Sequence, residues 1–209
     1  MVRLYMRNQL SSKRAAVALL AAAMLLPWPA WAAASTPAAV STVAGATAAG
    51  AESNTAKAQA LVEAAINMTD SDQAVKLLWQ ATELDPTFDN AYVYLGLYYN
   101  SRSDFAKVVQ VYQKMVKYHP NEVSAYLNIG EAYMSFSPPR LNDALPYYQK
   151  AINLDPASSF AAFRLGQIYA QQGPRDQAIK YLKLASSDRV KHPTIASEAD
   201  RLLRQMGAS

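Results

Sequence analysis

The residues that could do chemistry in this sequence are few and lie beside turns. Both histidines of the 209-residue chain, His119 and His192, directly precede a proline, and there is no cysteine. The missing thiols exclude disulfides, thiolate metal sites and a cysteine nucleophile. No glycine-rich phosphate loop, HExxH zinc motif or GxSxG serine motif is present. We therefore expect a protein without enzymatic activity, metal or other cofactor.

Carboxylates are the remaining candidates for acid–base or metal chemistry. Asp70, Asp72, Asp85, Asp89 and Asp104 are spread along the chain where loops lead into helical stretches. A carboxylate at a helix start accepts hydrogen bonds from backbone N–H groups and faces the positive end of the helix dipole. Helix capping is therefore the role that we expect for these side chains.

The N-terminal residues 1–32 have the pattern of a secretory signal. Four basic residues precede an uncharged run over residues 15–26, and Ala30-Trp31-Ala32 forms a small-x-small cleavage pattern. The twelve apolar residues of the run are fewer than the roughly 20 that span a bilayer. We expect export of a bacterial envelope protein, with the periplasm as its compartment. Secretion and an uncleaved N-terminal membrane anchor are the alternatives.

The charge balance argues against a nucleic-acid partner. The formal charge of +4 comes from the signal, because the rest of the chain has 16 basic and 16 acidic residues.

Residues 33–54 are mostly Ala, Ser, Thr, Pro and Gly. Such small side chains bury little apolar area, so this segment is predicted to be a linker without a helix.

From about Thr55 the sequence repeats itself. Three glycines recur in this part of the chain with the same neighbours: Gly96, Gly130 and Gly166. Each comes directly after a Leu or Ile, and a Tyr lies three residues after each. The first two glycines are 34 residues apart, and the last two are 36 apart. Apolar or small side chains three or four residues apart are typical of amphipathic helices. The sequence therefore predicts recurring helices, each with a glycine that permits close approach of a neighbour.

A second pattern follows each glycine motif, with residues spaced four, three and five apart. Its copies are Ala74-Leu78-Ala81-Pro86, Val108-Tyr112-Met115-Pro120, Ala144-Tyr148-Ala151-Pro156 and, without the proline, Ala178-Leu182-Ala185. The two patterns together predict pairs of helices, with prolines at the turn into the next pair. Pro146 lies within one predicted helix, which must begin near Asn142 or lose a backbone hydrogen bond.

These paired motifs resemble the tetratricopeptide repeat. The resemblance implies an all-α solenoid of helix hairpins, wound as a right-handed superhelix. The implied segments are a degenerate first repeat at 55–88, repeats at 89–122, 123–158 and 159–192, and a capping helix and tail at 193–209. The third repeat has two extra residues in its inter-helix loop. The bulky Tyr92, Tyr99, Tyr126 and Tyr133 are expected to fill the space between helices.

The resemblance also implies where a ligand would bind. In the family, the first helices of successive hairpins line a concave groove for peptide segments. The corresponding residues are Asn90, Val93, Tyr94, Leu97, Asn100, Leu127, Asn128, Glu131, Phe160, Phe163, Arg164 and Gln167. The basic clamp that some members use for a chain-terminal carboxylate is missing, and Arg164 is the one clear cation. For Phe160 and Phe163, packing within the array is the alternative.

The predicted function is an exported scaffold that binds a segment of a partner protein during assembly of an envelope or secretion machine. The alternative is a self-assembling structural repeat protein without a dedicated peptide ligand.

Removal of the signal gives the first testable prediction. We expect the mature chain to begin near Ala33, because cleavage follows the small-x-small pattern. Mass spectrometry of the protein from the envelope fraction measures this directly. Recovery of intact Met1 in the membrane pellet would show an uncleaved anchor.

Overall fold

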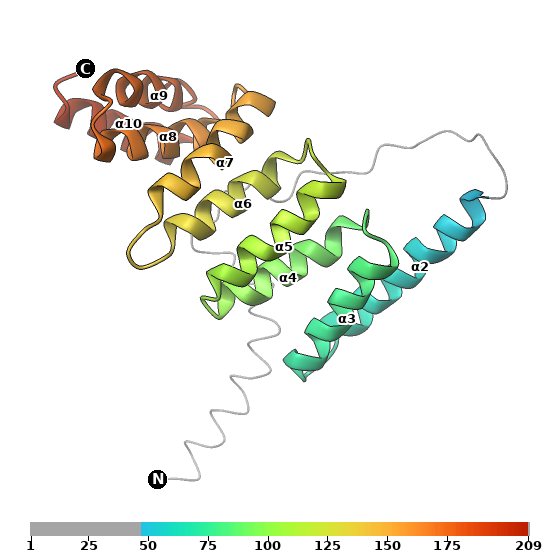
Figure 1. Cartoon of the computed structure of the whole chain (residues 1–209). Helices are drawn as coiled ribbons and strands as arrows, with labels where there is room; N and C mark the ends of the chain where they lie inside the picture. Colours follow the sequence, from blue (N-terminus) through green and yellow to red (C-terminus); the bar gives the residue numbers. More distant parts are fainter. Residues whose placement is uncertain (1–46, 209) are drawn as a thin grey trace, which may run out of the picture. The chain divides into compact units, whose positions relative to one another are not determined.

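The computed structural model describes residues 47–208, with side chains from Asn54 onward. The predicted signal and most of the predicted linker lie outside the described residues. Every regular element in the described range is a helix (Figure 1). The nine helices of the described residues are α2 (Thr47–Ile66), α3 (Ser71–Leu84), α4 (Asp89–Ser101), α5 (Phe105–Tyr118), α6 (Val123–Met134), α7 (Leu141–Leu154), α8 (Ser159–Gln172), α9 (Arg175–Ser187) and α10 (Pro193–Gln205).

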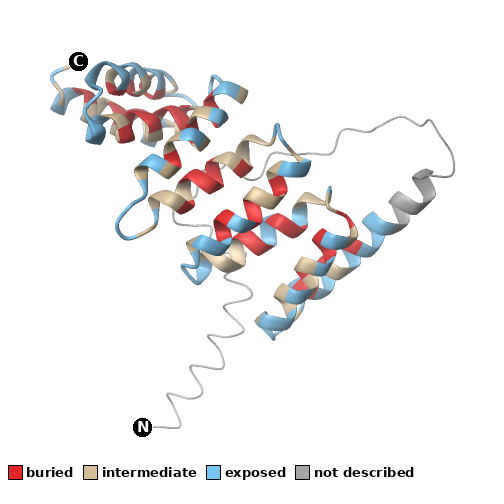
Figure 2. Cartoon of the chain, in the orientation of Figure 1, coloured by how far each residue is buried: buried red, intermediate tan, exposed pale blue. Residues whose placement is uncertain are grey.

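The helices pack in pairs along the chain. α2 pairs with α3, α4 with α5, α6 with α7 and α8 with α9, while α10 covers the end of the last pair. Buried residues gather where paired helices face each other, and exposed residues gather on their outer sides (Figure 2). The predicted all-α solenoid of four hairpins with a capping helix is confirmed.

Aspartates begin several helices, as their positions predicted. Oδ1 of Asp70 accepts hydrogen bonds from the backbone N–H groups of Asp72 (2.9 Å) and Gln73 (3.1 Å) at the start of α3. Asp104 accepts from the N–H of Lys107 (3.1 Å) at the start of α5. These bonds satisfy backbone donors that have no partner within the helix. The carboxylates of Asp70 and Asp104 therefore cap the helices that follow them.

The repeat glycines permit a close approach within three hairpins. A Cβ atom built at Gly130 would lie only 2.6 Å from Cζ of Tyr148. A Cβ at Gly96 would lie 2.6 Å from Cε2 of Tyr112, and one at Gly166 would lie 2.7 Å from Cγ of Leu182. The large residue comes in each case from the second helix of the same hairpin. The predicted role of the glycines is thereby confirmed.

The tyrosines of the first helices differ in burial. Tyr92 is fully buried, while Tyr99, Tyr126 and Tyr133 are half-buried. Tyr133 stacks on Tyr147 of the second helix, with ring centroids 5.7 Å apart. The half-buried rings also fill space between helices, but part of each remains accessible. The predicted packing role therefore holds, although Tyr92 alone among these four tyrosines is fully buried.

One helix boundary differs from its prediction, and the helix with an internal proline agrees with its own. α2 begins at Thr47, within the segment predicted to be a linker. The alanines at positions 48, 49 and 51 have the highest intrinsic helix propensity, which favours extending the helix without an apolar stripe. α7 begins at Leu141 and contains Pro146, so the carbonyl of Asn142 loses its helical N–H donor.

None of the helices in the described range is long and apolar enough to cross a membrane.

The glycine contacts predict that Gly130→Leu lowers the free energy of unfolding by roughly 3 kcal/mol, because the new side chain overlaps the Tyr148 ring. Chemical denaturation with circular dichroism measures the change. Ala170→Leu is the matched control, since Ala170 is an exposed helical position in α8. Equal stability of the two variants would contradict the close-packing assignment.

Candidate peptide-binding surfaces

The accessible part of the predicted groove lies on α4. Asn90 is exposed, and Val93 and Tyr94 keep 36% and 37% of their surface accessible. Leu97 and Asn100 are half-buried. These residues recur every three or four positions, so they follow one side of the helix. We call them the α4 stripe: an apolar and aromatic centre with amide groups at both ends.

The predicted groove residues on α6 require a correction. Leu127 and Asn128 are buried, with exposed fractions of 2% and 7%, and therefore do not contribute to an accessible surface. α6 packs against both α5 and α7. A helix that is covered on two sides buries more than one stripe of residues. An apolar residue one step away from the core stripe is then itself part of the core.

Arg164 also differs from its predicted role as an available cation. Its guanidinium forms a bidentate ion pair with Glu131: Nε lies 2.6 Å from Oε1, and Nη2 lies 2.5 Å from Oε2. The Tyr148 hydroxyl donates to the same Glu131 Oε1. The side chains of both charged residues are 24% exposed. The pair therefore joins α6 to α8 and cancels the charge that the sequence assigned to the groove.

The neighbours of Arg164 hold it in this position. Its guanidinium lies 5.2 Å from the centroid of the Phe160 ring, and Nη1 donates to Gln167 Oε1 over 2.9 Å. Burial alone would lower the pKa of Arg164, but attraction by the Glu131 carboxylate raises it above the usual value. Phe160, Phe163 and Gln167 are all half-buried. The α8 part of the predicted groove is thus largely occupied by contacts within the array.

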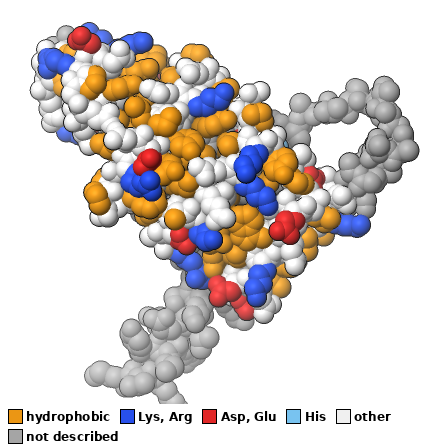
Figure 3. Space-filling model, in the orientation of Figure 1, with side chains coloured by type: hydrophobic (Ala, Val, Ile, Leu, Met, Phe, Trp, Pro, Cys, Tyr) orange, Lys and Arg blue, Asp and Glu red, His pale blue; other side chains and the backbone are white. Residues whose placement is uncertain are grey.

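A second surface lies between α3 and α5 and was not predicted. It is a cleft of about 750 Å³, with Trp79 and Glu83 on the α3 side. The α5 side carries Lys107, Lys114 and Lys117, with Gln110, Gln113 and Val116 beside them. Hydrophobic and basic side chains adjoin over these two helices (Figure 3). The three lysines of a helix without acidic residues were the sequence signal that could have indicated this cleft.

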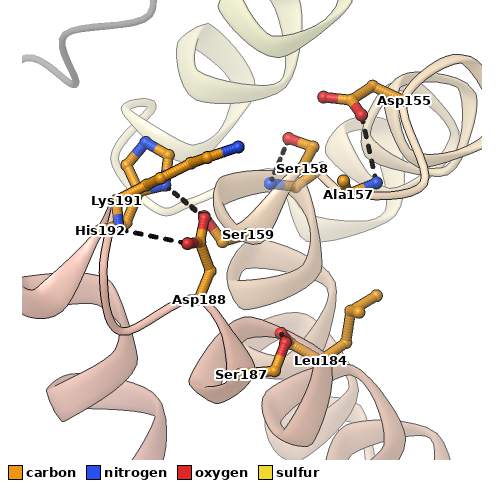
Figure 4. Close-up of polar contacts among 10 residues, drawn as sticks. Asp155, Ala157, Ser158, Ser159, Leu184, Ser187, Asp188, Lys191 and His192 are labelled. Carbon is orange, nitrogen blue, oxygen red and sulfur yellow. Dashed lines mark hydrogen bonds and ion pairs between the residues drawn. The ribbon is translucent and has the colours of Figure 1, made fainter.

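A serine, a histidine and an aspartate meet where α8 begins and α9 ends (Figure 4). Nδ1 of His192 lies 2.9 Å from Ser159 Oγ and 2.8 Å from Asp188 Oδ2. A nucleophilic serine needs the base on one ring nitrogen and the carboxylate on the other. Here both partners use Nδ1, and Ser159 is buried. The arrangement therefore connects the start of α8 to the turn between α9 and α10.

The charges at this junction are stabilised locally. The hydrogen bond with His192 is the main cause that lowers the pKa of Asp188 below its usual value, and the backbone N–H of Lys191 adds to the effect.

The other histidine also lies near an aspartate: Nε2 of His119 is 3.5 Å from Asp89 Oδ1. Within residues 47–208, no group of three or more His, Asp or Glu side chains is placed to hold a metal ion.

Comparison with known proteins agrees with the hairpin architecture. A tetratricopeptide-repeat family model matches residues 161–187, which cover most of α8 and α9. The other three hairpins share the same helix pairing, and two of them share its glycine contact. The described residues therefore have the fold of a tetratricopeptide-repeat array.

One relative found by sequence and two found by structure show what this repeat array is similar to. Anaphase-promoting complex subunit 3 of Schizosaccharomyces pombe is 26% identical over 100 residues, which are 48% of this chain and only 15% of that protein. YrrB, a repeat protein with an unusual peptide-binding site, superposes with a TM-score of 0.57 at 20% identity, over 79% of this chain and 86% of its own. The TPR2B domain of yeast Sti1, in complex with pHsp70, gives a TM-score of 0.51 at 23% identity, over 56% and 94%.

The Glu131–Arg164 pair predicts a measurable coupling between α6 and α8. A double-mutant cycle with Glu131→Gln and Arg164→Gln should give a coupling energy of about 2 kcal/mol, because the bidentate pair is largely shielded from solvent. The free energy of unfolding of the four proteins provides the measurement.

The exposed Glu198–Arg201 pair within α10 serves as the control cycle. Its coupling should stay below about 0.5 kcal/mol, as is usual for solvent-exposed ion pairs. A Glu131–Arg164 coupling no larger than this control would mean that the pair does not hold the two hairpins together.

Proposed function

We propose that this protein is an exported scaffold that holds a segment of a partner protein against the α4 stripe. In this proposal it serves the assembly of an envelope or secretion machine. The protein binds and positions the segment and does not transform it.

The exposure of Val93 and Tyr94 is the observation that carries this proposal. Both side chains remain accessible on a first helix although each is apolar or aromatic. An aromatic side chain at an accessible position adds little to the core, and such side chains are enriched among the anchors of protein interfaces. Asn90 and Asn100 at the ends of the stripe offer amide groups that can bond the backbone of an extended segment.

The named structural relatives support binding of a peptide segment. The Sti1 domain forms a complex with pHsp70, and YrrB has a peptide-binding site. Their identity to this chain is too low to transfer a partner or a site. They support the general idea that a repeat array of this size binds a short segment of another protein.

The export part of the proposal is supported by the sequence of residues 1–32. Basic residues, a short apolar run and a small-x-small pattern occur in the order of a secretory signal. The complete absence of cysteine also means that the chain can fold in an oxidising compartment without forming disulfides.

Tyr94→Ala tests the α4 stripe. We expect capture of the partner to weaken roughly thirtyfold, because an interface anchor of this kind contributes on the order of 2 kcal/mol. Quantitative mass spectrometry of proteins that co-purify from the envelope fraction provides the measurement. The helical content should stay unchanged, since the side chain lies at the surface.

Leu184→Ala is the matched control, because Leu184 has the same exposed fraction of 37% but lies on α9, a second helix. A partner lost from both variants, or from neither, would contradict the assignment of the stripe. Light scattering distinguishes the remaining alternative: a mass that increases with concentration, without a captured partner, would favour self-assembly.

A further inference from the structure

The cleft between α3 and α5 carries positive charge that the protein does not neutralise. Lys107, Lys114 and Lys117 line it and face a single acidic lining residue, Glu83. All ion pairs of the described residues involve arginine or histidine, and none involves a lysine. The cleft therefore has an excess of about two positive charges that are available to a ligand.

Two of the three lysines are positioned by neutral groups. Lys107 Nζ donates to Gln110 Oε1 over 3.1 Å. Lys114 Nζ donates to Thr82 Oγ1 over 3.0 Å and lies 5.1 Å from the centroid of the Trp79 ring. These contacts orient the ammonium groups without cancelling their charge. Separations of seven and three residues put all three lysines on the same side of α5.

Trp79 and two amide side chains complete the cleft. The indole N–H of Trp79 donates to the Tyr99 hydroxyl over 3.2 Å, which restrains the ring, and the half-buried ring keeps part of its surface accessible in the cleft beside Lys114. Gln113 Nε2 donates to the Tyr147 hydroxyl over 2.9 Å, so its carbonyl oxygen can still accept. Gln110 uses its oxygen for Lys107, so its amide hydrogens can still donate.

We propose that this cleft binds an acidic, extended segment of a protein, separately from the α4 stripe. Carboxylates of the segment pair with the three lysines, and a small or apolar side chain rests on Trp79. Gln110 and Gln113 can bond a carbonyl and an N–H of its backbone. Alternate side chains of an extended chain point the same way, which lets several carboxylates face α5 together.

The local chemistry favours a peptide over a nucleic acid. Beyond residue 32 the chain has equal numbers of basic and acidic residues, so no wide positive field surrounds the cleft. The positive charge is confined to one helix beside one aromatic ring, and the amides match a polypeptide backbone. Because the cleft belongs to α3 and α5, this inference does not rest on the function proposed for α4.

Trp79 gives a direct assay of the cleft. The other tryptophans of the chain are Trp28 and Trp31, so the full chain with Trp28→Phe and Trp31→Phe reports on Trp79 alone. The probe is a short capped peptide of alternating Glu and Ala, compared with one of alternating Gln and Ala. We expect a saturable change in Trp79 emission with the Glu peptide, weakened by salt, and none with the Gln peptide.

Variants of the lysines test the charge assignment. Lys107→Gln with Lys117→Gln removes two exposed charges of the cleft and should weaken binding of the Glu peptide about tenfold. Lys150→Gln with Lys180→Gln removes two exposed charges from α7 and α9 and should leave the affinity unchanged. Calorimetry confirms each affinity independently of fluorescence.

Three results would overturn the proposal. The first is equal binding of the Glu and Gln peptides. The second is equal weakening by the two double variants, which would indicate only a general charge effect. The third is saturable binding of a thymidine oligonucleotide at Trp79 without binding of the Glu peptide, which would assign the cleft to nucleic acid. Loss of partner capture in Tyr94→Ala bears only on the α4 stripe, so the two proposals fail separately.

Discussion

The fit of one large side chain against one glycine determines how closely the two helices of a hairpin approach. Tyr112, Tyr148 and Leu182 each occupy space where any other residue at the facing glycine would place its Cβ. Because well-packed interiors tolerate little added volume, this contact also fixes the relative rotation of the paired helices. The side that each helix presents to its neighbours, and the side that remains accessible, follow from that rotation.

Both candidate surfaces result from this arrangement. The α4 stripe lies on the first helix of its hairpin, and the basic cleft lies between α3 and α5, which are second helices. The stripe is apolar with amide ends, whereas the cleft combines an aromatic ring with ammonium groups that form no ion pair within the described residues. Surfaces of such different chemistry would suit different ligands, so the two proposals together assign two separate segments to one repeat array.

Most of the fold could be predicted because its determinants are local and periodic. A glycine motif and a second-helix motif alternate along the chain, and this alternation was sufficient to predict the hairpins and their order. The glycines are Gly96, Gly130 and Gly166. The start of α2 was missed, since alanine-rich sequence favours a helix without producing a periodic stripe. The candidate site was less predictable. The partner of Arg164 lies 33 residues away, and the burial of Leu127 depends on how many helices surround α6, which no local pattern encodes.

Tyr148 connects the interior of the third hairpin to its surface. Its ring fills the space beside Gly130, and its hydroxyl donates to Glu131, which in turn binds Arg164 of the next hairpin. The packing of Tyr148 inside this hairpin is therefore coupled to the Glu131–Arg164 ion pair at its surface. A ligand that drew Arg164 away from Glu131 would alter the hydrogen bonding of a core tyrosine, so its binding would be thermodynamically linked to local opening of the hairpin. The fourth hairpin has Leu182 at the same step and lacks a hydroxyl for such a link.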